Sequence, residues 1–185
     1  MSDSPGKNGV LDALAAFFSA LLPDGSQGFA GSVSVPVGSG YAVPQPPAGI
    51  QETRELVHAH SELVRRYLAM KEDFQAQTGR GLIETCTWRS AAHQQELYQI
   101  GRRGIIGERT VTQLDGVHSR SRHNTYPSQA VDVAVDLDPG VSKHVVWDRA
   151  SYAPLGPLAD KHSLVWGGNW HMDDFPHLEL PAGVA

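Results

Sequence analysis

The sequence is poor in cysteine and has no long apolar run. Its 185 residues include a single cysteine, Cys86, which excludes a disulfide framework and any zinc finger built on several cysteines. No apolar run reaches the roughly 18 residues that a membrane-spanning helix needs. Acidic residues (20) outnumber lysine and arginine (15), so the net charge is −5. Because a generic nucleic-acid binder needs a basic surface, this composition argues against nucleic acid as a partner.

The chain does have enough apolar sequence for a core, together with many histidines. Hydrophobic residues make up 41% and charged residues 19% of the sequence, as expected for a globular chain that needs no disulfide or metal to fold. The length favours one main domain. The nine histidines are many for this length, and their grouping carries most of the information about function.

The first fifty residues differ from the rest of the chain. Residues 10–22 place leucine and phenylalanine on one helical face and are followed by a proline, which predicts a short amphipathic helix. Residues 25–49 are mainly Gly, Ser, Pro, Val and Ala, a composition typical of a linker. We therefore expect a helix plus linker over 1–50 and the main folded domain over 51–185. The helix would dock on the domain, or on an assembly or membrane partner. Disorder and a secretory signal are the alternatives, although the apolar stretch is short and charged for a signal.

From residue 51 onward, helical and strand-like hydrophobic periodicities alternate. The helices predicted from this pattern span residues 51–77, 91–100 (with Ser90 as N-cap) and 148–162, and the predicted strands span residues 82–88, 130–137, 164–166 and 177–180. Residues 104–116 are expected to form a loop or short hairpin. This order predicts an α+β fold in which helices pack on a small, mainly antiparallel sheet, with the functional site in a cleft on the sheet.

Three histidine and aspartate positions match the needs of a hydrolytic zinc site. Such a site uses about three histidine or carboxylate ligands and leaves one position open for water. His123 precedes the predicted strand that carries Asp132, and His177 begins a later strand. Two imidazoles and one carboxylate leave the metal positive enough to acidify a bound water. These three residues are therefore candidate metal ligands.

A hydrolytic site also needs a base that is not a ligand and a cation for the developing negative charge. Asp174 lies three residues before His177, on a turn that contains a proline, and is the candidate base; the neighbouring Asp173 is the alternative. Arg89, at a strand-to-helix junction, is the candidate cation. A role in a surface salt bridge is its alternative interpretation.

These motifs resemble those of zinc peptidases that cut peptidoglycan stem peptides, the group of D-alanyl-D-alanine carboxypeptidases and phage L-alanyl-D-glutamate endopeptidases. SRHNTYPSQAVD (121–132) is similar to their Ser-x-His and Ala-x-Asp elements, and DFPH (174–177) to their Asp-x-x-His. Further similar stretches are TWRSAAHQQELYQIG (87–101), VTQLDG (111–116) and LVWGGNW (164–170). The resemblance covers roughly residues 55–180 and is nearest the phage endolysins. The turn at 124–131 is longer than in many members and lacks their glycine.

The resemblance implies a role for each candidate residue. It implies that the ligands of one zinc ion are His123, Asp132 and His177. It implies Asp174 as the general base, and Arg89 as the group that polarises the carbonyl and stabilises the oxyanion.

Ser121 would line the substrate pocket by the same resemblance. Trp170 and His171, on the turn after the two glycines, are candidates for the pocket wall, with a core position equally open for Trp170. His118 is close to the motif but is not needed as a ligand. Cys86 is expected to be a small buried residue.

The implied function is that of a zinc metallopeptidase acting on peptidoglycan stem peptides. Cleavage between L-Ala and D-Glu is the first interpretation and D-alanyl-D-alanine carboxypeptidase activity the second. A non-catalytic, wall-binding phage tail component is an alternative of another class, against which the acidic residue at 174 argues.

We expect a monomer with one Zn²⁺ ion and no organic cofactor. Since no clear signal peptide is visible, we expect either an endolysin held in the host cytoplasm until lysis or a virion-borne lysin. Both would act on the bacterial cell wall.

Overall fold

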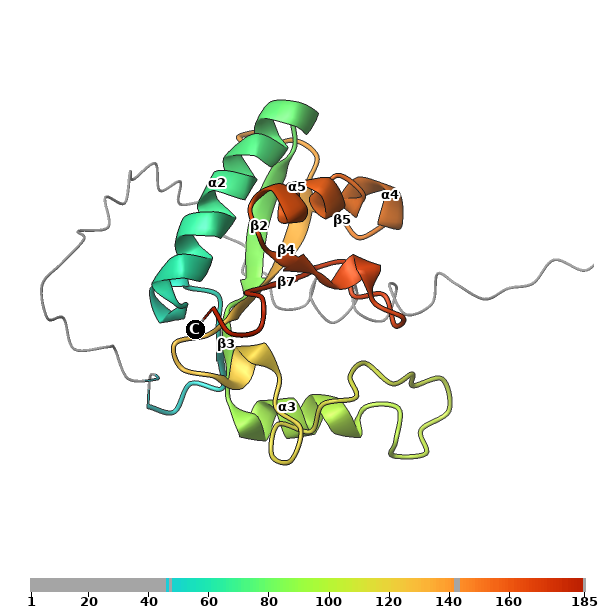
Figure 1. Cartoon of the computed structure of the whole chain (residues 1–185). Helices are drawn as coiled ribbons and strands as arrows, with labels where there is room; N and C mark the ends of the chain where they lie inside the picture. Colours follow the sequence, from blue (N-terminus) through green and yellow to red (C-terminus); the bar gives the residue numbers. More distant parts are fainter. Residues whose placement is uncertain (1–45, 47, 142–143, 185) are drawn as a thin grey trace, which may run out of the picture.

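The computed structural model describes residues 46, 48–141 and 144–184. The predicted N-terminal helix and most of the linker lie outside these residues, so the division of the chain at residue 50 stays a prediction. The described part has the predicted α+β architecture, with helices packed against a mainly antiparallel sheet (Figure 1). None of the helices in this part has both the length and the apolar character needed to cross a bilayer.

One sheet organises the described part of the chain. The helices are α2 (Ser61–Thr78), α3 (Ala91–Gln99), α4 (Arg149–Tyr152) and α5 (Leu155–Lys161), and the 3-10 turns are η1 (Leu56–His58), η2 (Arg122–Asn124) and η3 (Gly167–Asn169). The strands are β1 (Glu52–Thr53), β2 (Gly81–Cys86), β3 (Trp88–Arg89), β4 (Ala130–Asp136), β5 (Val145–Val146), β6 (Val165–Trp166) and β7 (His177–Glu179). The sheet has the order β2-β4-β7-β6, with β5 also paired to β4, whereas β1 pairs with β3 in a separate ribbon.

The central strand β4 has the alternating sequence AVDVAVD, and all seven of its residues are buried. Val131, Val133 and Val135 belong to the hydrophobic core that also includes residues of α2, α4 and α5. Because side chains alternate along a strand, Asp132 lies on the opposite face. The face of β4 that carries Asp132 is therefore polar but enclosed by protein, and α3 lies away from the other helices (Figure 1).

Helix α2 begins later than predicted. The helix expected over 51–77 starts only at Ser61, with His60 as its N-cap, and the preceding residues form β1 and η1 instead. Pairing of β1 with β3 explains the difference, because this tertiary contact outweighs the helical spacing of the local sequence. The predicted end is confirmed, since Gly79 has the left-handed backbone (φ 70°) that often ends a helix.

The strand predicted over 82–88 is divided into β2 and β3. The register with β4 shifts between Glu84 and Cys86, so that Cys86 lies opposite Asp132. A bulge of this kind redirects the side chains that follow it. Cys86 is thereby placed next to His123, its Sγ lying 3.6 Å from the histidine Nδ1.

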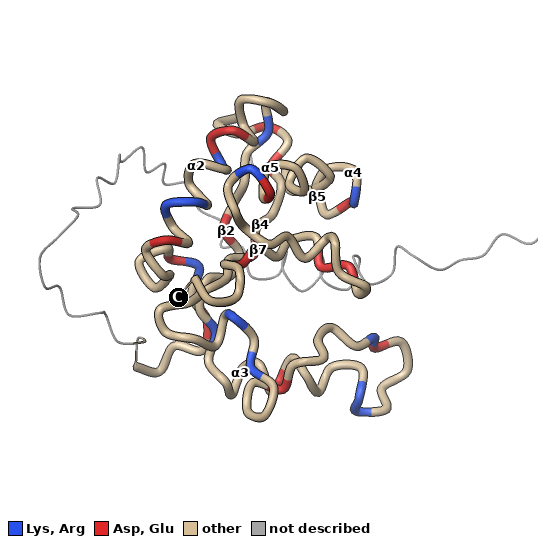
Figure 2. Tube along the Cα trace, viewed as in Figure 1, with Lys and Arg blue, Asp and Glu red and all other residues tan. Residues whose placement is uncertain are grey.

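The other predicted elements are largely confirmed. Ser90 caps α3 by accepting a hydrogen bond from the main-chain N–H of His93 (3.1 Å). The helix predicted over 148–162 consists of the two short helices α4 and α5, because Pro154 has no N–H to continue the first one. Within the described residues, basic and acidic side chains are interspersed along α2 and the loop after α3 (Figure 2).

Candidate active site

His123, Asp132 and His177 meet on the enclosed polar face of the sheet. Asp132 and His177 are a cross-strand pair of β4 and β7, and η2 supplies His123. The Asp132 Oδ1 atom lies 3.1 Å from His123 Nε2 and 3.0 Å from His177 Nδ1, and the two nitrogens are 3.2 Å apart. All three residues are buried. The structure thus brings the three predicted ligands together.

The arrangement of these donor atoms fits a tetrahedral zinc ion. Ligand atoms at the usual zinc distance of about 2.1 Å lie about 3.4 Å from one another in tetrahedral geometry. The observed separations of 3.0, 3.1 and 3.2 Å are close to this value. Two imidazole nitrogens and a carboxylate oxygen are also ligand types that zinc takes in hydrolytic sites.

Cys86 forms a second donor group with His123 and Asp132. Its Sγ approaches His123 at Nδ1, whereas the Nε2 atom faces Asp132. The same Nδ1 lies 2.7 Å from the carbonyl oxygen of Thr87, which can only accept, so Nδ1 carries the hydrogen. Burial raises the pKa of the Cys86 thiol well above its usual value, which disfavours the thiolate that a metal requires. We therefore favour the group that contains His177.

Without a metal, the charges of this cluster depend on one another. Burial alone would lower the pKa of His177, but hydrogen bonds to Asp132 and Glu179 outweigh it and raise the pKa to about 10. Burial alone would raise the pKa of Asp132, but the neighbouring His123 and His177 hold it well below its ordinary value. Both shifts favour an ion pair between the His177 imidazolium and the Asp132 carboxylate when no metal is bound.

Ser121 and Asn124 close the turn that carries His123. The Ser121 hydroxyl oxygen accepts a hydrogen bond from the His123 main-chain N–H (3.3 Å), and Asn124 Oδ1 accepts one from the Ser121 N–H (2.9 Å). This reciprocal capping box fixes the turn. Asn124 also donates to the carbonyl oxygen of Arg89 (3.0 Å), which ties η2 to β3. Ser121 is thus placed beside His123, and its contact with substrate stays a prediction.

Arg89 is buried next to Asp132, and all three guanidinium nitrogens have partners. Nε donates to Glu52 Oε2 (2.7 Å) and Nη1 donates to Gln94 Oε1 (3.1 Å). Nη2 lies 3.5 Å from Asp132 Oδ2. The alternative of a surface salt-bridge residue is therefore wrong. A guanidinium stays charged at any relevant pH, so Arg89 places a permanent positive charge in the cluster.

Asp173 and Asp174 lie in different surroundings, although they are neighbours in sequence. Asp173 is exposed, and its Oδ2 accepts a hydrogen bond from Arg149 (2.6 Å). Asp174 is partly buried. Burial raises the pKa of Asp174, an effect that the nearby His177 opposes and Asp132 reinforces. Asp174 is thus the member of the pair that interacts with the candidate ligands.

Gly167 allows the turn after β6 to approach the segment that carries Asp174 and His177. A Cβ at this position would lie 2.5 Å from the Asp174 carbonyl oxygen and 3.1 Å from the His177 Cβ. The Gly167 carbonyl oxygen accepts a hydrogen bond from the Asp174 N–H (3.0 Å). This close approach explains why the turn begins with glycine.

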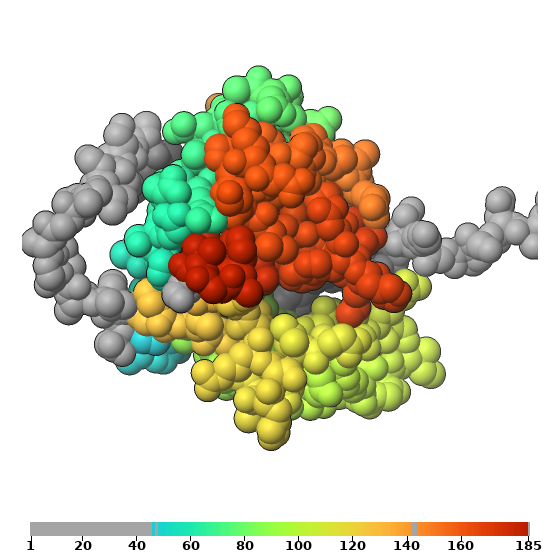
Figure 3. Space-filling view, in the orientation of Figure 1, coloured from blue at the N-terminus to red at the C-terminus, as the bar shows by residue number. Residues whose placement is uncertain are grey.

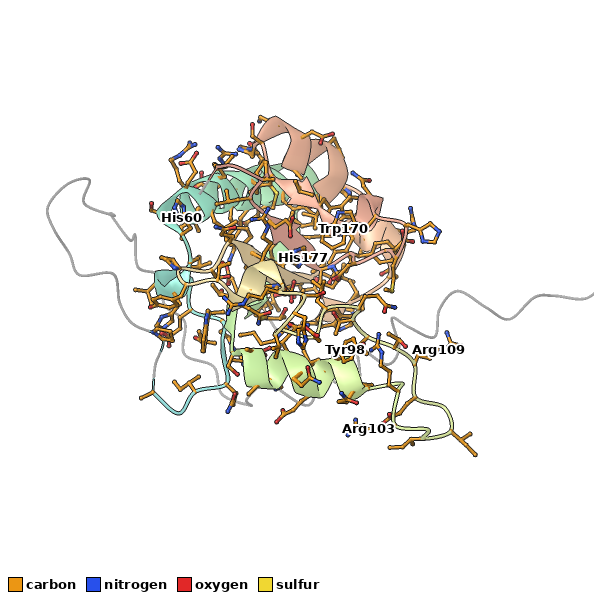
Figure 4. The ribbon with its side chains drawn as sticks, turned by 60° about the horizontal axis from the view of Figure 1, so that its bottom comes forward. His60, Tyr98, Arg103, Arg109, Trp170 and His177 are labelled. Carbon is orange, nitrogen blue, oxygen red and sulfur yellow. The ribbon has the colours of Figure 1, made fainter. Side chains whose placement is uncertain are left out.

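Trp170 lies at the edge of the site. Its ring centroid is 5.0 Å from that of His177, and the residue is 39% exposed, so it is not a core tryptophan. Figure 4 shows Trp170 and His177 close together, on the side of the sheet toward α3. His171 is exposed on the same turn. A hollow separates this orange-red part of the surface from the yellow-green part formed by α3 and the loop after it (Figure 3).

Two carboxylates of the site were not predicted from the sequence. Glu179 Oε2 lies 3.0 Å from His177 Nε2, and Glu52 binds Arg89. Glu179 follows His177 by two residues in a predicted strand, a spacing that places both side chains on one face and could have identified it. Glu52 lay in a segment predicted to be helical, so no local signal connected it with the site.

Two comparisons with known proteins find similarity to peptidases. A family model described as D-alanyl-D-alanine carboxypeptidase matches residues 115–180, a segment that contains both predicted histidine ligands. The solved structure of the L-Ala D-Glu endopeptidase ChiX from Serratia marcescens is similar, with a TM-score of 0.50 and 25% sequence identity. This match covers 68% of the present chain and 83% of the ChiX chain. A search among curated protein sequences finds no match. The two matches confirm the resemblance that the motifs indicate, to the group of peptidases that includes D-alanyl-D-alanine carboxypeptidases and L-alanyl-D-glutamate endopeptidases.

Proposed function

We propose that this chain is a zinc-dependent peptidase that hydrolyses the amide bond between L-Ala and D-Glu in peptidoglycan stem peptides. The observation that carries the proposal is the meeting of His123 Nε2, Asp132 Oδ1 and His177 Nδ1 at separations of 3.0–3.2 Å. Similarity to ChiX, described as an L-Ala D-Glu endopeptidase, supports this choice of bond. The description of the matching family model supports D-alanyl-D-alanine carboxypeptidase activity as the second candidate.

The described side chains can be assigned roles in such a hydrolysis. A zinc ion bound by these atoms would polarise the scissile carbonyl and acidify a water molecule. Asp174 is not a proposed ligand, and its carboxylate accepts the proton of the attacking water and returns it to the leaving amine. Burial raises the pKa of Asp174, and a carboxylate with a higher pKa is a stronger base. Arg89 contributes a fixed positive charge that stabilises the developing oxyanion.

The substrate pocket is proposed to lie in the hollow next to these residues. Trp170 and His171 would form its wall on the η3 side, where the exposed indole ring offers an apolar surface beside His177. Ser121 would contribute from the η2 side. The residues of these walls would decide which amide bond is cut, because the same metal chemistry serves both candidate bonds.

The biological setting is part of the proposal. The motifs are nearest those of phage endolysins, which supports a monomeric lysin that acts on the bacterial cell wall. It would remain in the host cytoplasm until lysis, or travel on the virion. Partial burial of Asp174 next to the candidate ligands supports a catalytic protein over a wall-binding tail component that has lost turnover.

Digestion of purified peptidoglycan tests the function and separates the candidate bonds. The zinc-loaded protein is incubated with purified walls at pH 7, and the products are identified by mass spectrometry and by labelling of new amino termini. We expect new D-Glu amino termini and stem peptides that lack L-Ala. Release of free D-Ala without new D-Glu termini would show the carboxypeptidase instead. If neither product forms, the proposed function is wrong.

A further inference from the structure

The His177 ring has a carboxylate at each of its two nitrogens. Nδ1 lies 3.0 Å from Asp132 Oδ1, and Nε2 lies 3.0 Å from Glu179 Oε2. Glu179 follows His177 by two residues on β7, so both side chains lie on the same face of the sheet. The residues paired with Glu179 on the neighbouring strands are Ala130 and Val165, whose side chains cannot form hydrogen bonds. Neither cross-strand neighbour therefore competes with His177 for a hydrogen bond to the Glu179 carboxylate.

The two nitrogens of His177 must have different roles if one of them binds a metal. The metal-binding nitrogen offers a lone pair, so in a neutral ring the other nitrogen carries the hydrogen. With Nδ1 in the proposed zinc site, Nε2 donates to the Glu179 carboxylate, which can only accept. We infer that Glu179 is a positioning residue that holds the orientation and tautomer of His177 and, as an anion, makes Nδ1 a stronger ligand. The inference rests on the proposed zinc site.

The other two proposed ligands are held by different means. His123 Nδ1 donates to the main-chain carbonyl of Thr87 (2.7 Å), a contact that no side-chain substitution at Thr87 removes directly. The second oxygen of Asp132 faces Arg89 (3.5 Å), a residue already assigned to catalysis. A substitution of Glu179 therefore removes the hydrogen bond that orients a proposed histidine ligand, without altering a proposed ligand or catalytic residue.

Among the described residues, the Glu179 carboxylate has one other charged partner, Arg122, which supplies the control. Its Oε1 lies 3.8 Å from Arg122 Nε, beyond hydrogen-bond distance. Arg122 also donates to Gln129 Oε1, and a partly exposed ion pair of this length contributes little to stability. Arg122→Gln removes this ion pair and leaves the contact between Glu179 and His177 intact. A role of Glu179 through Arg122 would therefore appear in both variants.

The test measures metal binding by the full chain. Zinc affinity is determined by competition with a chromophoric chelator, and the visible absorption of the cobalt-substituted protein reports the ligand geometry. We expect Glu179→Ala to weaken zinc binding about 10- to 100-fold and to alter the cobalt spectrum. Glu179→Gln keeps an oxygen acceptor without the charge, so we expect a smaller, several-fold loss. Arg122→Gln should bind zinc as wild type does, and the metal-free variants should unfold at similar temperatures.

Two results would overturn the positioning role: wild-type zinc affinity in Glu179→Ala, or an equal loss of affinity in Arg122→Gln. If Glu179→Ala does not fold, Glu179→Gln decides: weakened binding supports the inference, and unchanged affinity with an unchanged cobalt spectrum overturns it. Failure of the wild-type protein to bind zinc would instead overturn the proposed function. Tight binding by wild type with no effect at Glu179 overturns only the positioning role.

Discussion

Asp132 of β4 and His177 of β7 form a cross-strand pair, with Asp132 Oδ1 3.0 Å from His177 Nδ1. Antiparallel pairing places such side chains on one face with their Cβ atoms about 5 Å apart. Two of the three candidate ligands are thus brought together by the register of the central strands. We expect substitutions of these side chains to abolish metal binding without unfolding the sheet.

Metal content tests the proposed ligand set directly. We expect the dialysed wild-type protein to hold about one zinc ion per chain, and His123→Ala and His177→Ala to hold almost none. Elemental analysis provides the measurement. His118→Ala is the control, because His118 is exposed and pairs with Asp115 rather than with the cluster (3.1 Å). A chelator should abolish peptidase activity, and added zinc should restore it. Retention of zinc by both ligand variants would contradict the assignment.

The adjacent aspartates provide a matched pair for the general base. We expect Asp174→Asn to lower kcat about 10²- to 10⁴-fold, because an amide cannot accept the proton of the attacking water. Asp173→Asn should remain near wild type, since Asp173 is exposed and bound to Arg149. Rates of stem-peptide cleavage are compared at equal zinc content. Equal activities of the two variants would remove Asp174 from the mechanism.

Arg89→Lys tests whether the charge of Arg89 alone is sufficient. A lysine ammonium keeps the charge but not the planar fork that contacts Glu52, Gln94 and Asp132 together. We expect kcat/KM to fall about 10²-fold with zinc still bound. Arg65→Lys, on the exposed pair with Glu62 of α2, is the control and should leave activity unchanged. Wild-type activity of Arg89→Lys would show that the fork has no role.

Asp148 tests the pH dependence of stability outside the site. Its Oδ1 accepts a hydrogen bond from the Ser151 N–H (3.0 Å) at the N-terminus of α4. Bonds from the Ser151 hydroxyl and main chain lower the pKa of Asp148, although desolvation opposes this. We expect Asp148→Ala to reduce the free energy of unfolding by ~1 kcal/mol at pH 7.

The sign of this effect follows from the lowered pKa. The stabilisation is present above the unfolded-state pKa of about 3.9 and is lost as the pH falls through the lower folded-state value. Denaturant unfolding of wild type and variant should therefore converge as the solution is acidified below about pH 4. A difference that persists undiminished at lower pH would contradict the role of the Asp148 charge.

Much of the local structure was predictable because it depends on neighbours within a few residues. Ser90 caps α3 with its own hydroxyl, and Gly79 ends α2 in a left-handed conformation. The alternation in β4 follows from the period of a strand. The α2 start was predicted wrongly because β1 is drawn into pairing with β3, a contact made with distant residues.

The sequence by itself determined which residues are candidates for the chemistry, because the His, Asp and Arg types and their order in three motifs are properties of the chain alone. Only the tertiary structure decided which of their side chains contact one another. Glu52 reaches Arg89 across 37 residues, and Asp132 meets His177 across 45. It also decided that Asp174 rather than Asp173 interacts with the cluster, and which nitrogen of each histidine faces Asp132. The physical reason is that these contacts depend on the register between strands and on the way in which distant segments pack against the sheet. The periodicity of the local sequence specifies neither of them.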